Sequence, residues 1–320
     1  MRIGIIANPR AGRGKARSVV GRIERALNDA GHTHFLHQAG PIAVAESDLA
    51  DCQALLLAGG DGTVHHALPL ACRTGIPIWH VPLGTENLFS RAFGMGLSPE
   101  NLLRALNAFR VQKCDLGSAG DTPFALMCSV GPDAQIVHDV NAHRRGRISR
   151  MTYVPWCIRQ MLRPRLPPLT IEADGSICVR EAPGIAVVAN CHRYGFGINP
   201  APEAMMDDGL LDLVFLPASS SLGVFAWAMR GKFGRLRSSA RRLHLRVREV
   251  TIRSTSDAPF CIQADGEPLP ARADGSLHIT TLPGALHVLL PTEFQSRSSS
   301  NAPLYPPSGR DGSPPSSSRI

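Results

Sequence analysis

The stretch Leu55-Leu56-Leu57-Ala58-Gly59-Gly60-Asp61-Gly62-Thr63 decides the fold class of this chain. Its first half is an unbroken apolar run, which is typical of a strand in a parallel sheet covered on both faces. The glycines let the backbone come close to a phosphate, and the helix expected from Gly62 to Arg73 would direct its first N–H groups at that anion. We interpret the stretch as a phosphate-binding loop between a strand and a helix.

Asp61 lies inside this loop and is open to two interpretations. A carboxylate there can hold Mg²⁺ through water or contact a nucleophile. The competing interpretation is an ordinary glycine turn in which Asp61 caps the helix.

The first 110 residues repeat the alternation of apolar strand and helix. Strands are expected at Arg2–Ala7, Ala54–Ala58 and Ile76–Val81, and a helix at Lys15–Ala30. This order predicts a parallel sheet with ligands at the carboxyl ends of its strands. Three loops leave those ends: Asn8–Gly14, Gly59–Thr63 and Pro82–Asn87.

After about residue 111 short strand-like runs replace the alternation, which predicts a mainly antiparallel β domain. The expected strands are Val111–Leu116, Phe124–Val130, Pro168–Ala173, Ile177–Arg180, Ile185–Ala189, Leu211–Leu216, Leu245–Arg253, Phe260–Gln263 and Ala285–Leu290. Asp174-Gly175 and Asp274-Gly275 are expected hairpin turns. We therefore predict an α/β fold: a Rossmann-like nucleotide-binding domain over 1–112, a β-rich, sandwich-like domain over 113–293, and a disordered Ser/Pro-rich tail over 294–320.

Composition excludes several classes of protein. With 43% hydrophobic residues among 320, the chain can bury a sizeable core. No apolar run approaches the roughly 20 residues of a membrane-spanning helix, and the first strand is too short for a signal peptide. Eight cysteines without a CxxC pair exclude a zinc ribbon or a thioredoxin motif. The 34 basic and 26 acidic residues leave a net charge of +8, but no nucleic-acid-binding motif accompanies it.

The first and third loops carry weaker signals on their own. The run from Asn8 to Lys15 resembles a Walker A loop but lacks its first glycine, and Ala16 stands where Ser or Thr would bind magnesium. Pro82-Leu83-Gly84-Thr85-Glu86-Asn87 offers Thr85 and Asn87 as hydrogen-bonding groups at a strand end.

Taken in order, the three loops resemble the signature of the diacylglycerol kinase catalytic-domain family, which includes bacterial lipid kinases and sphingosine and ceramide kinases. Three later segments strengthen the resemblance: Gly131-Pro132-Asp133-Ala134, then Pro202-x-Ala204 with Asp207-Asp208-Gly209-Leu210-Leu211-Asp212-Leu213, and Asp265-Gly266-Glu267. The resemblance spans roughly residues 2 to 290.

The resemblance implies a lipid kinase that moves the γ-phosphoryl group of ATP to a lipid hydroxyl with Mg²⁺, in a cleft between two domains. By position it implies that the following residues contact the nucleotide: Asn8, Gly59, Gly60, Asp61, Gly62, Thr63, Gly84, Thr85 and Asn87. It implies that Asp265 is the general base, with Glu267 and Asp208 in the same acidic network. It further implies that Asp207 binds a structural Mg²⁺, helped by backbone carbonyls near Ala204 and Leu210.

One departure from the family pattern keeps an alternative open. Many members carry Asp directly after the Asn of the third loop, whereas Leu88 follows Asn87 here. A catalytically impaired regulator that binds nucleotide or lipid is therefore the main alternative. A second is a kinase of a soluble substrate, as in NAD kinases, although their G-S-T-A-Y-like segment is absent.

Two stretches without an acidic residue predict contact with an anionic membrane. Residues 230–248 hold eight basic residues, and residues 141–171 hold seven arginines with Tyr153 and Trp156. The competing interpretation is a solvated basic face over a core helix. The expectation is a cytoplasmic protein associated peripherally with the inner face of the membrane, with a homodimer possible. Neither the acceptor lipid nor the role of the tail can be inferred from the sequence.

Overall fold

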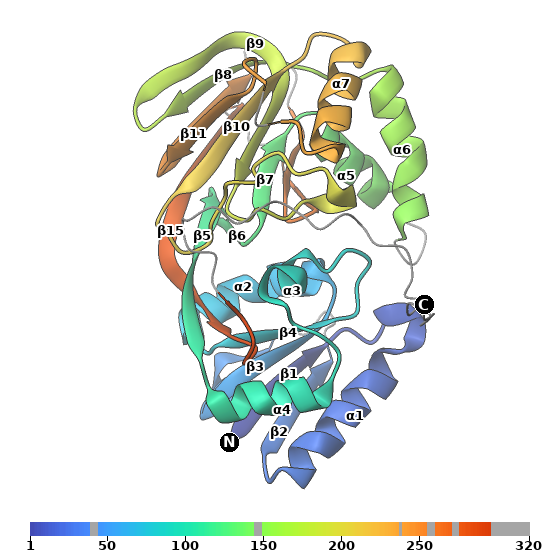
Figure 1. The fold of residues 1–320 in the computed structure, drawn as a ribbon, viewed down its shortest axis with the longest axis vertical. Helices are drawn as coiled ribbons and strands as arrows, with labels where there is room; N and C mark the ends of the chain where they lie inside the picture. The colour runs from blue at the N-terminus through green and yellow to red at the C-terminus, as the bar shows by residue number, and fades with distance from the viewer. Residues whose placement is uncertain (39–43, 144–148, 237–238, 255–259, 271–274, 296–320) are drawn as a thin grey trace, which may run out of the picture.

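The computed structural model describes residues 1–38, 44–143, 149–236, 239–254, 260–270 and 275–295. The chain forms two halves stacked along its long axis, with the N-terminus in the lower half of Figure 1. The predicted tail lies outside the described residues from 296 onward, and so does Asp274 of the second predicted hairpin turn.

The lower half is built on a parallel sheet in the order β2-β1-β3-β4. Its interior strands are apolar, and Leu55, Leu56 and Leu57 are completely buried. The elements of this half are β1 (Arg2–Ala7), α1 (Ala16–Asp29), β2 (Thr33–Gln38), β3 (Cys52–Gly59), α2 (Asp61–Thr74), β4 (Ile78–Pro82), α3 (Leu88–Phe93) and α4 (Pro99–Ala108), with short 3-10 turns at Gly12–Gly14 and Glu46–Leu49.

The upper half is a β-sandwich with three helices on one side (Figure 1). An apolar cluster that includes Phe124, Ile171, Val188 and Ile252 fills the space between its sheets. Its strands are β5 (Val111–Ala119), β6 (Thr122–Phe124), β7 (Met127–Val130), β8 (Pro168–Ala173), β9 (Ser176–Ala189), β10 (Leu211–Pro217), β11 (Leu243–Val247), β12 (Glu249–Ser254), β13 (Ile262–Ala264), β14 (Glu267–Leu269) and β15 (Ser276–Leu289). Its helices are α5 (Pro132–Ala142), α6 (Arg150–Leu162) and α7 (Ser221–Lys232), and Gly195–Gly197 is a 3-10 turn. The predicted fold class is confirmed.

Three strand predictions in this half were wrong, because strand ends do not always coincide with breaks in the apolar pattern. Segment 124–130 is divided between β6 and β7. Segments 177–180 and 185–189 belong to one strand, β9, which bends near Glu181 (φ 46°) and pairs with β8 and then with β7 and β10. Segment 245–253 is two strands, β11 and β12. The N–H groups of Arg248 and Glu249 both donate to Asp174 Oδ1 (2.9 Å each), and this turn sends the chain into the other sheet.

The last strand, β15, joins the two halves. It pairs antiparallel with β12 and β5 in the upper half and parallel with β4 in the lower half, where Val288 lies opposite Ile78. Figure 1 shows it running down one side of the molecule. The N-terminal sheet is thereby extended by residues from the end of the described chain.

Among the described helices, none combines the length and the apolar character that crossing a lipid bilayer requires.

Candidate functional site

The phosphate-binding loop predicted at Gly59–Thr63 lies where β3 passes into α2. Gly60 is extended and directly precedes the helix, so the first N–H groups of α2 have no partner within the helix. Gly60 and Gly84 meet backbone to backbone: a Cβ at Gly84 would lie 2.5 Å from the Gly60 Cα atom. Only glycine permits this approach, which brings the second and third loops together.

Two asparagine side chains that were predicted to contact the nucleotide form hydrogen bonds within their own loops. Asn87 adopts a left-handed conformation (φ 49°), its Oδ1 accepts the Gly84 N–H (2.7 Å), and its Nδ2 donates to the Gly84 carbonyl (3.0 Å). Asn8 Oδ1 accepts the Arg10 N–H (3.0 Å). These side chains fix the curvature of the loops around the site.

Asp61 is the first residue of α2 and connects that helix to α3. Its Oδ1 accepts the Phe89 N–H (3.0 Å), and the Leu88 N–H donates to the same carboxylate. Burial raises the pKa of Asp61, and the charge of Asp265 adds to that rise, while the two N–H donors and His80 oppose it. Leu88 is buried at the start of α3, so its side chain contributes packing where the family pattern has a carboxylate.

Asp265 lies at the turn between β13 and β14 with its side chain 3% exposed. Its Oδ1 accepts the N–H groups of Leu126 (2.7 Å) and Met127 (3.0 Å). Its Oδ2 accepts the Ala125 N–H (2.8 Å) and faces His65 Nδ1 at 3.3 Å. Four donors therefore surround the carboxylate, and three of them belong to its own half of the molecule.

His65 is a site residue to which the sequence analysis assigned no role. It is 6% exposed and comes from α2, whereas Asp265 is 200 residues away in the upper half. Burial lowers the pKa of His65, but the hydrogen bond to Asp265 and the charges of Asp265 and Glu267 outweigh burial and raise it overall. The sequence signal that could have identified His65 was its helical spacing, because it lies four residues after Asp61 and on the same helix face.

His80 forms a hydrogen bond to the first residue of the phosphate-binding loop. It is completely buried in β4, and its Nε2 donates to the Gly59 carbonyl (3.0 Å). Burial lowers its pKa, so the neutral imidazole is favoured. Its contact holds the end of β3 where the loop begins.

A cavity of about 2090 Å³ joins these groups. Its lining includes residues of the three loops together with Arg10 and Lys15, and the carboxylate residues Asp61, Asp265 and Glu267. Glu267 reaches across from β14 so that its Oε1 lies against Gly62. The upper half contributes mostly apolar lining residues, with Asp133, Gln160 and Tyr194 among the polar ones. We call its apolar part the apolar lobe and define it by these lining residues: Leu126, Met127, Ile136, Val137, Cys157, Met161, Ile185, Val187, Leu216, Val224 and Trp227.

The predicted site residues divide into two groups. Those that line the cavity are Asn8, Gly60, Asp61, Gly62, Thr63, Gly84, Thr85, Asp265 and Glu267. Gly59 and Asn87 lie behind this wall within the same loops. The predicted metal-binding residues, which are Ala204, Asp207, Asp208 and Leu210, do not line it.

The residues predicted to bind a structural Mg²⁺ have other partners. Asp207 Oδ2 accepts from Gln112 Nε2 (2.9 Å), whereas Asp208 Oδ2 forms an ion pair with Arg246 and Oδ1 accepts the Leu210 N–H (3.1 Å). The described residues contain no group of three or more His, Cys, Asp or Glu that could hold a metal ion. Arg246 therefore occupies one oxygen of Asp208 in this arrangement, and the metal-binding roles of Asp207 and Asp208 stay predictions.

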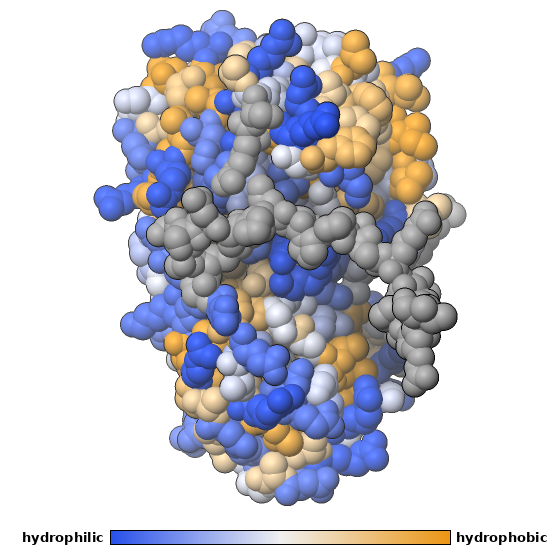
Figure 2. Space-filling model, in the orientation of Figure 1, coloured by the Kyte–Doolittle hydropathy of each residue, from blue (hydrophilic) through white to orange (hydrophobic). Residues whose placement is uncertain are grey.

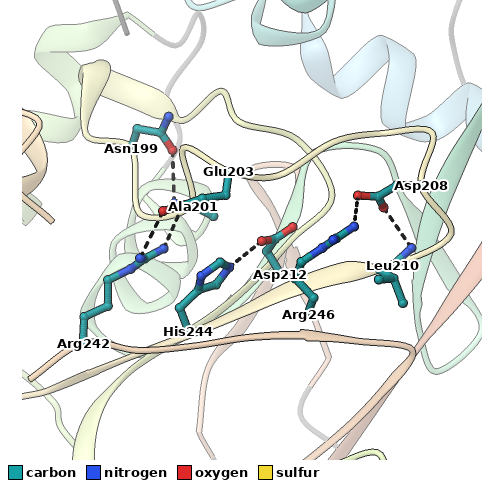
Figure 3. A network of polar contacts seen from close by, with 9 residues as sticks. All are labelled: Asn199, Ala201, Glu203, Asp208, Leu210, Asp212, Arg242, His244 and Arg246. Atoms are coloured by element: carbon teal, nitrogen blue, oxygen red, sulfur yellow. Dashed lines mark hydrogen bonds and ion pairs between the residues drawn. The ribbon is translucent and has the colours of Figure 1, made fainter. Parts of the chain in front are cut away.

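Figure 3 shows the network that occupies Asp208 instead. Arg242, just before β11, and two alternate residues within β11 each meet an acid from β10 or from the segment before it. These pairs are Arg242 with Glu203, His244 with Asp212, and Arg246 with Asp208. They bind the segment between β9 and β10 to the sheet, so the P-x-A-x-x-D-D-G run has a structural role here.

Asp115 is a second residue that the sequence analysis missed. It is 4% exposed on β5, and its carboxylate accepts the N–H groups of Gly209 (2.6 Å) and Gly284 (2.7 Å). It thereby ties the segment before β10 to the strand that joins the halves.

Comparison with known proteins agrees with both halves of the fold. Residues 2–119 match the diacylglycerol kinase catalytic domain, and residues 127–290 match the YegS C-terminal NAD kinase beta sandwich-like domain. A Pseudomonas putida protein named "Probable lipid kinase YegS-like" is 31% identical over 252 residues, which cover 78% of this chain and 80% of that protein. The chain belongs to the diacylglycerol kinase and YegS-like family of lipid kinases.

Other relatives extend the same picture. A diacylglycerol kinase of Mycobacterium tuberculosis is 29% identical over 255 residues, covering 74% of this chain and 77% of that protein. The crystal structure of a diacylglycerol kinase from Bacillus anthracis shares the fold with a TM-score of 0.66 at 19% identity, covering 92% of this chain and 98% of that one. The predicted family membership is confirmed, and with it the class of enzyme, a phosphotransferase with an alcohol group as acceptor.

Proposed function

We propose that this lipid kinase transfers the γ-phosphoryl group of ATP to a hydroxyl of a diacylglycerol- or sphingoid-like membrane lipid. One observation carries the proposal: a single cavity joins the phosphate-binding loops, the carboxylates and the apolar lobe. The reaction needs these three parts within reach of one another, because phosphoryl transfer depends mainly on positioning and charge neutralisation.

ATP would bind with its phosphates at the N-terminus of α2. The N–H groups there and the helix dipole favour an anion, and Arg10 and Lys15 add positive charge to the wall. Glu267, whose Oε1 lies beside Gly62, would hold the Mg²⁺ that accompanies ATP, and the metal would supply charge neutralisation at the phosphates.

The acceptor hydroxyl must lose a proton, and the geometry favours Asp61 over Asp265 for taking it. Each carboxylate oxygen has two acceptor positions, and four donors already surround Asp265. Burial raises the pKa of Asp61, and a carboxylate with a raised pKa accepts a proton more readily near neutral pH. Asp265 would instead hold the two walls of the cavity in register.

The apolar lobe favours a lipid acceptor over a soluble one. Its walls come from sheet residues such as Val187 and from helix residues such as Val224 and Trp227. A polar soluble acceptor would gain nothing from this surface, whereas an acyl or sphingoid chain is stabilised by leaving water. This argues against the alternative of an NAD-kinase-like enzyme. The basic segments 141–171 and 230–248 would hold the protein at the inner face of the membrane.

Substitution of Val224 by Trp tests the role assigned to the lobe. The larger side chain narrows the lobe from α7, so we expect phosphorylation of long-chain lipids to fall strongly while ATP binding and transfer to a short-chain acceptor persist. Equal loss with both acceptors, or no loss with either, would contradict the assignment. Transfer to soluble acceptors alone would favour the soluble-substrate kinase.

A further inference from the structure

The outer face of α6 and α7 exposes large apolar side chains at helical spacing. On α6 these are Met151 (73% exposed), Val154 (37%), Ile158 (52%) and Leu162 (71%), at intervals of three, four and four residues. Such a stripe lies along one side of a helix. In a soluble surface helix, that side normally packs against a core.

On α7 and just after it, Leu222 (75%), Phe225 (43%) and Phe233 (70%) are also exposed, at intervals of three and eight residues. The two helices are neighbours, since Ser221 Oγ donates to the Leu162 carbonyl (2.8 Å). We call these seven side chains the apolar face. Figure 2 shows hydrophobic residues gathered in the upper right, where Figure 1 places these helices.

The same helices form a wall of the apolar lobe on their inner side. Cys157 and Met161 of α6 and Val224 and Trp227 of α7 line it. The helix pair therefore carries apolar side chains both toward the lobe and toward the surroundings, although Arg150 and Gln160 of α6 also line the cavity. Such helices are more stable against hydrocarbon than against water.

Met151 and Phe196 indicate where the lobe opens. Both line the cavity, and both belong to the exposed large apolar residues. Phe196 contacts the Tyr153 ring (centroids 5.7 Å apart), and its carbonyl accepts from Lys232 Nζ at the end of α7 (3.0 Å). The opening therefore lies at the edge of the apolar face.

Charge around the apolar face matches an anionic surface. Exposed basic residues flank it at Arg159, Arg163, Arg230 and Lys232. No acidic residue occurs in segments 149–171 or 218–236. An apolar strip with a basic border is typical of segments that lie in the interface of an anionic bilayer.

We propose that the apolar face inserts into an anionic lipid bilayer and that the acceptor lipid enters the lobe from the bilayer at the Met151–Phe196 opening. This inference rests on the proposed function for the identity of the cargo, but insertion itself does not. A lipid that moves from bilayer to lobe along this route keeps its chains out of water, which removes the main barrier to extracting it.

Vesicle sedimentation tests the proposal with an Ile158→Ser/Leu162→Ser variant. The matched control is Leu97→Ser/Ile177→Ser, which changes two exposed apolar side chains (41% and 45%) elsewhere. With vesicles of phosphatidylglycerol and phosphatidylcholine we expect the outer-face variant to partition about tenfold less than wild type and the control to be unchanged. Vesicles of phosphatidylcholine alone should bind wild type more weakly.

Two further measurements separate the possible failures. With diacylglycerol in vesicles, the outer-face variant should lose activity, while with dispersed dihexanoylglycerol it should match wild type. Equal vesicle binding by the variant and wild type would overturn the proposal. The proposal would also be overturned if wild type does not bind vesicles and forms a concentration-dependent dimer that the variant does not form. The apolar face would then be an interface with a second copy of this chain. If no acceptor is phosphorylated, the proposed function fails while vesicle binding still decides the insertion.

Discussion

At the scale of single residues, His65 is the contact that couples the two walls of the cavity. Three of the four donors to Asp265 belong to its own half and stay in place if the cavity opens, whereas His65 comes from α2. The phosphate-binding end of α2 is therefore linked to Asp265 by one adjustable hydrogen bond. We infer that His65 is a positioning residue.

Substituting His65 by Ala should lower kcat about tenfold with little change in the KM for ATP, because a charge-assisted hydrogen bond contributes about 1.5–3 kcal/mol. His65→Asn should keep most of the activity, since Asn Nδ2 takes the place of Nδ1. Steady-state kinetics measure both, with His278→Asn, exposed at β15, as the control. Equal losses in the Ala and Asn variants would contradict a hydrogen-bonding role.

Because the pKa of His65 is raised, the stability of the folded protein should depend on pH, and the His65→Asn variant should not show this dependence. A histidine whose pKa is raised on folding stabilises the protein below its unfolded pKa, near 6.5, and that stability is lost as pH rises through the folded pKa. Thermal unfolding of wild type should therefore show a pH-dependent component in this range that His65→Asn lacks. Identical pH profiles for the two proteins would argue against the charged contact.

Substitution of Asp61 by Asn and of Asp265 by Asn should change the melting temperature Tm in opposite directions. Burial raises the pKa of Asp61, so its charge costs stability as pH rises through that pKa, and Asp61→Asn should raise Tm at pH 7–8. Asp265→Asn places an NH₂ group against backbone donors and loses hydrogen bonds of about 1.5–3 kcal/mol each, so Tm should fall by several degrees. A lower Tm for Asp61→Asn would contradict the inference that the buried charge of Asp61 lowers the stability of the folded protein.

At the scale of elements, the close contact of the second and third loops depends on glycine. A Cβ at Gly84 would lie 2.5 Å from the Gly60 Cα atom, which is backbone and cannot rotate away. Gly84→Ala should therefore push the loops apart and weaken ATP binding about tenfold or more. Isothermal titration of ATP measures this, with Gly96→Ala as the control because a Cβ there meets nothing within 4 Å.

The sequence predicts a helix or strand well where burial determines both the pattern of apolar residues and the structure. The strand, glycine turn and helix around Gly59–Thr63 were predictable because burial on both faces requires an unbroken apolar run. The bend of β9 and the turn between β11 and β12 were not, because each rests on a distant partner or a single dihedral angle. The contact of His65 with Asp265 escaped for the same reason, since 200 residues separate the two side chains.

The segment predicted to hold Mg²⁺ shows a different limit of sequence reasoning, although the metal site itself stays a prediction. The run from Asp207 to Leu213 matches the family pattern, but Arg246 of β11 neutralises Asp208. That arginine lies 38 residues further along the chain and appears in no motif. A motif indicates which residues a family uses, and the partners that the fold supplies determine what those residues do.

At the scale of the whole molecule, β15 should make the two halves unfold together. It pairs with β4 in the lower half and with β5 and β12 in the upper half, so the sheet is continuous from one half to the other. Trp79 in the lower half and Trp227 in the upper half are both buried and report on each half separately in single-tryptophan variants. We expect coincident urea transitions; two separated midpoints would show that the halves are independent.

The central claim is that the cavity moves phosphate from ATP to a lipid. Incubation of wild type with γ-labelled ATP, Mg²⁺ and a mixed lipid extract tests it most directly, with Asp61→Asn and Asp265→Asn alongside. We predict a labelled lipid with wild type and its loss in both variants while ATP binding persists in Asp61→Asn. Label in wild type and Asp61→Asn alike would contradict the role of Asp61, and ATP binding without any labelled lipid would contradict the claim itself and favour a regulator.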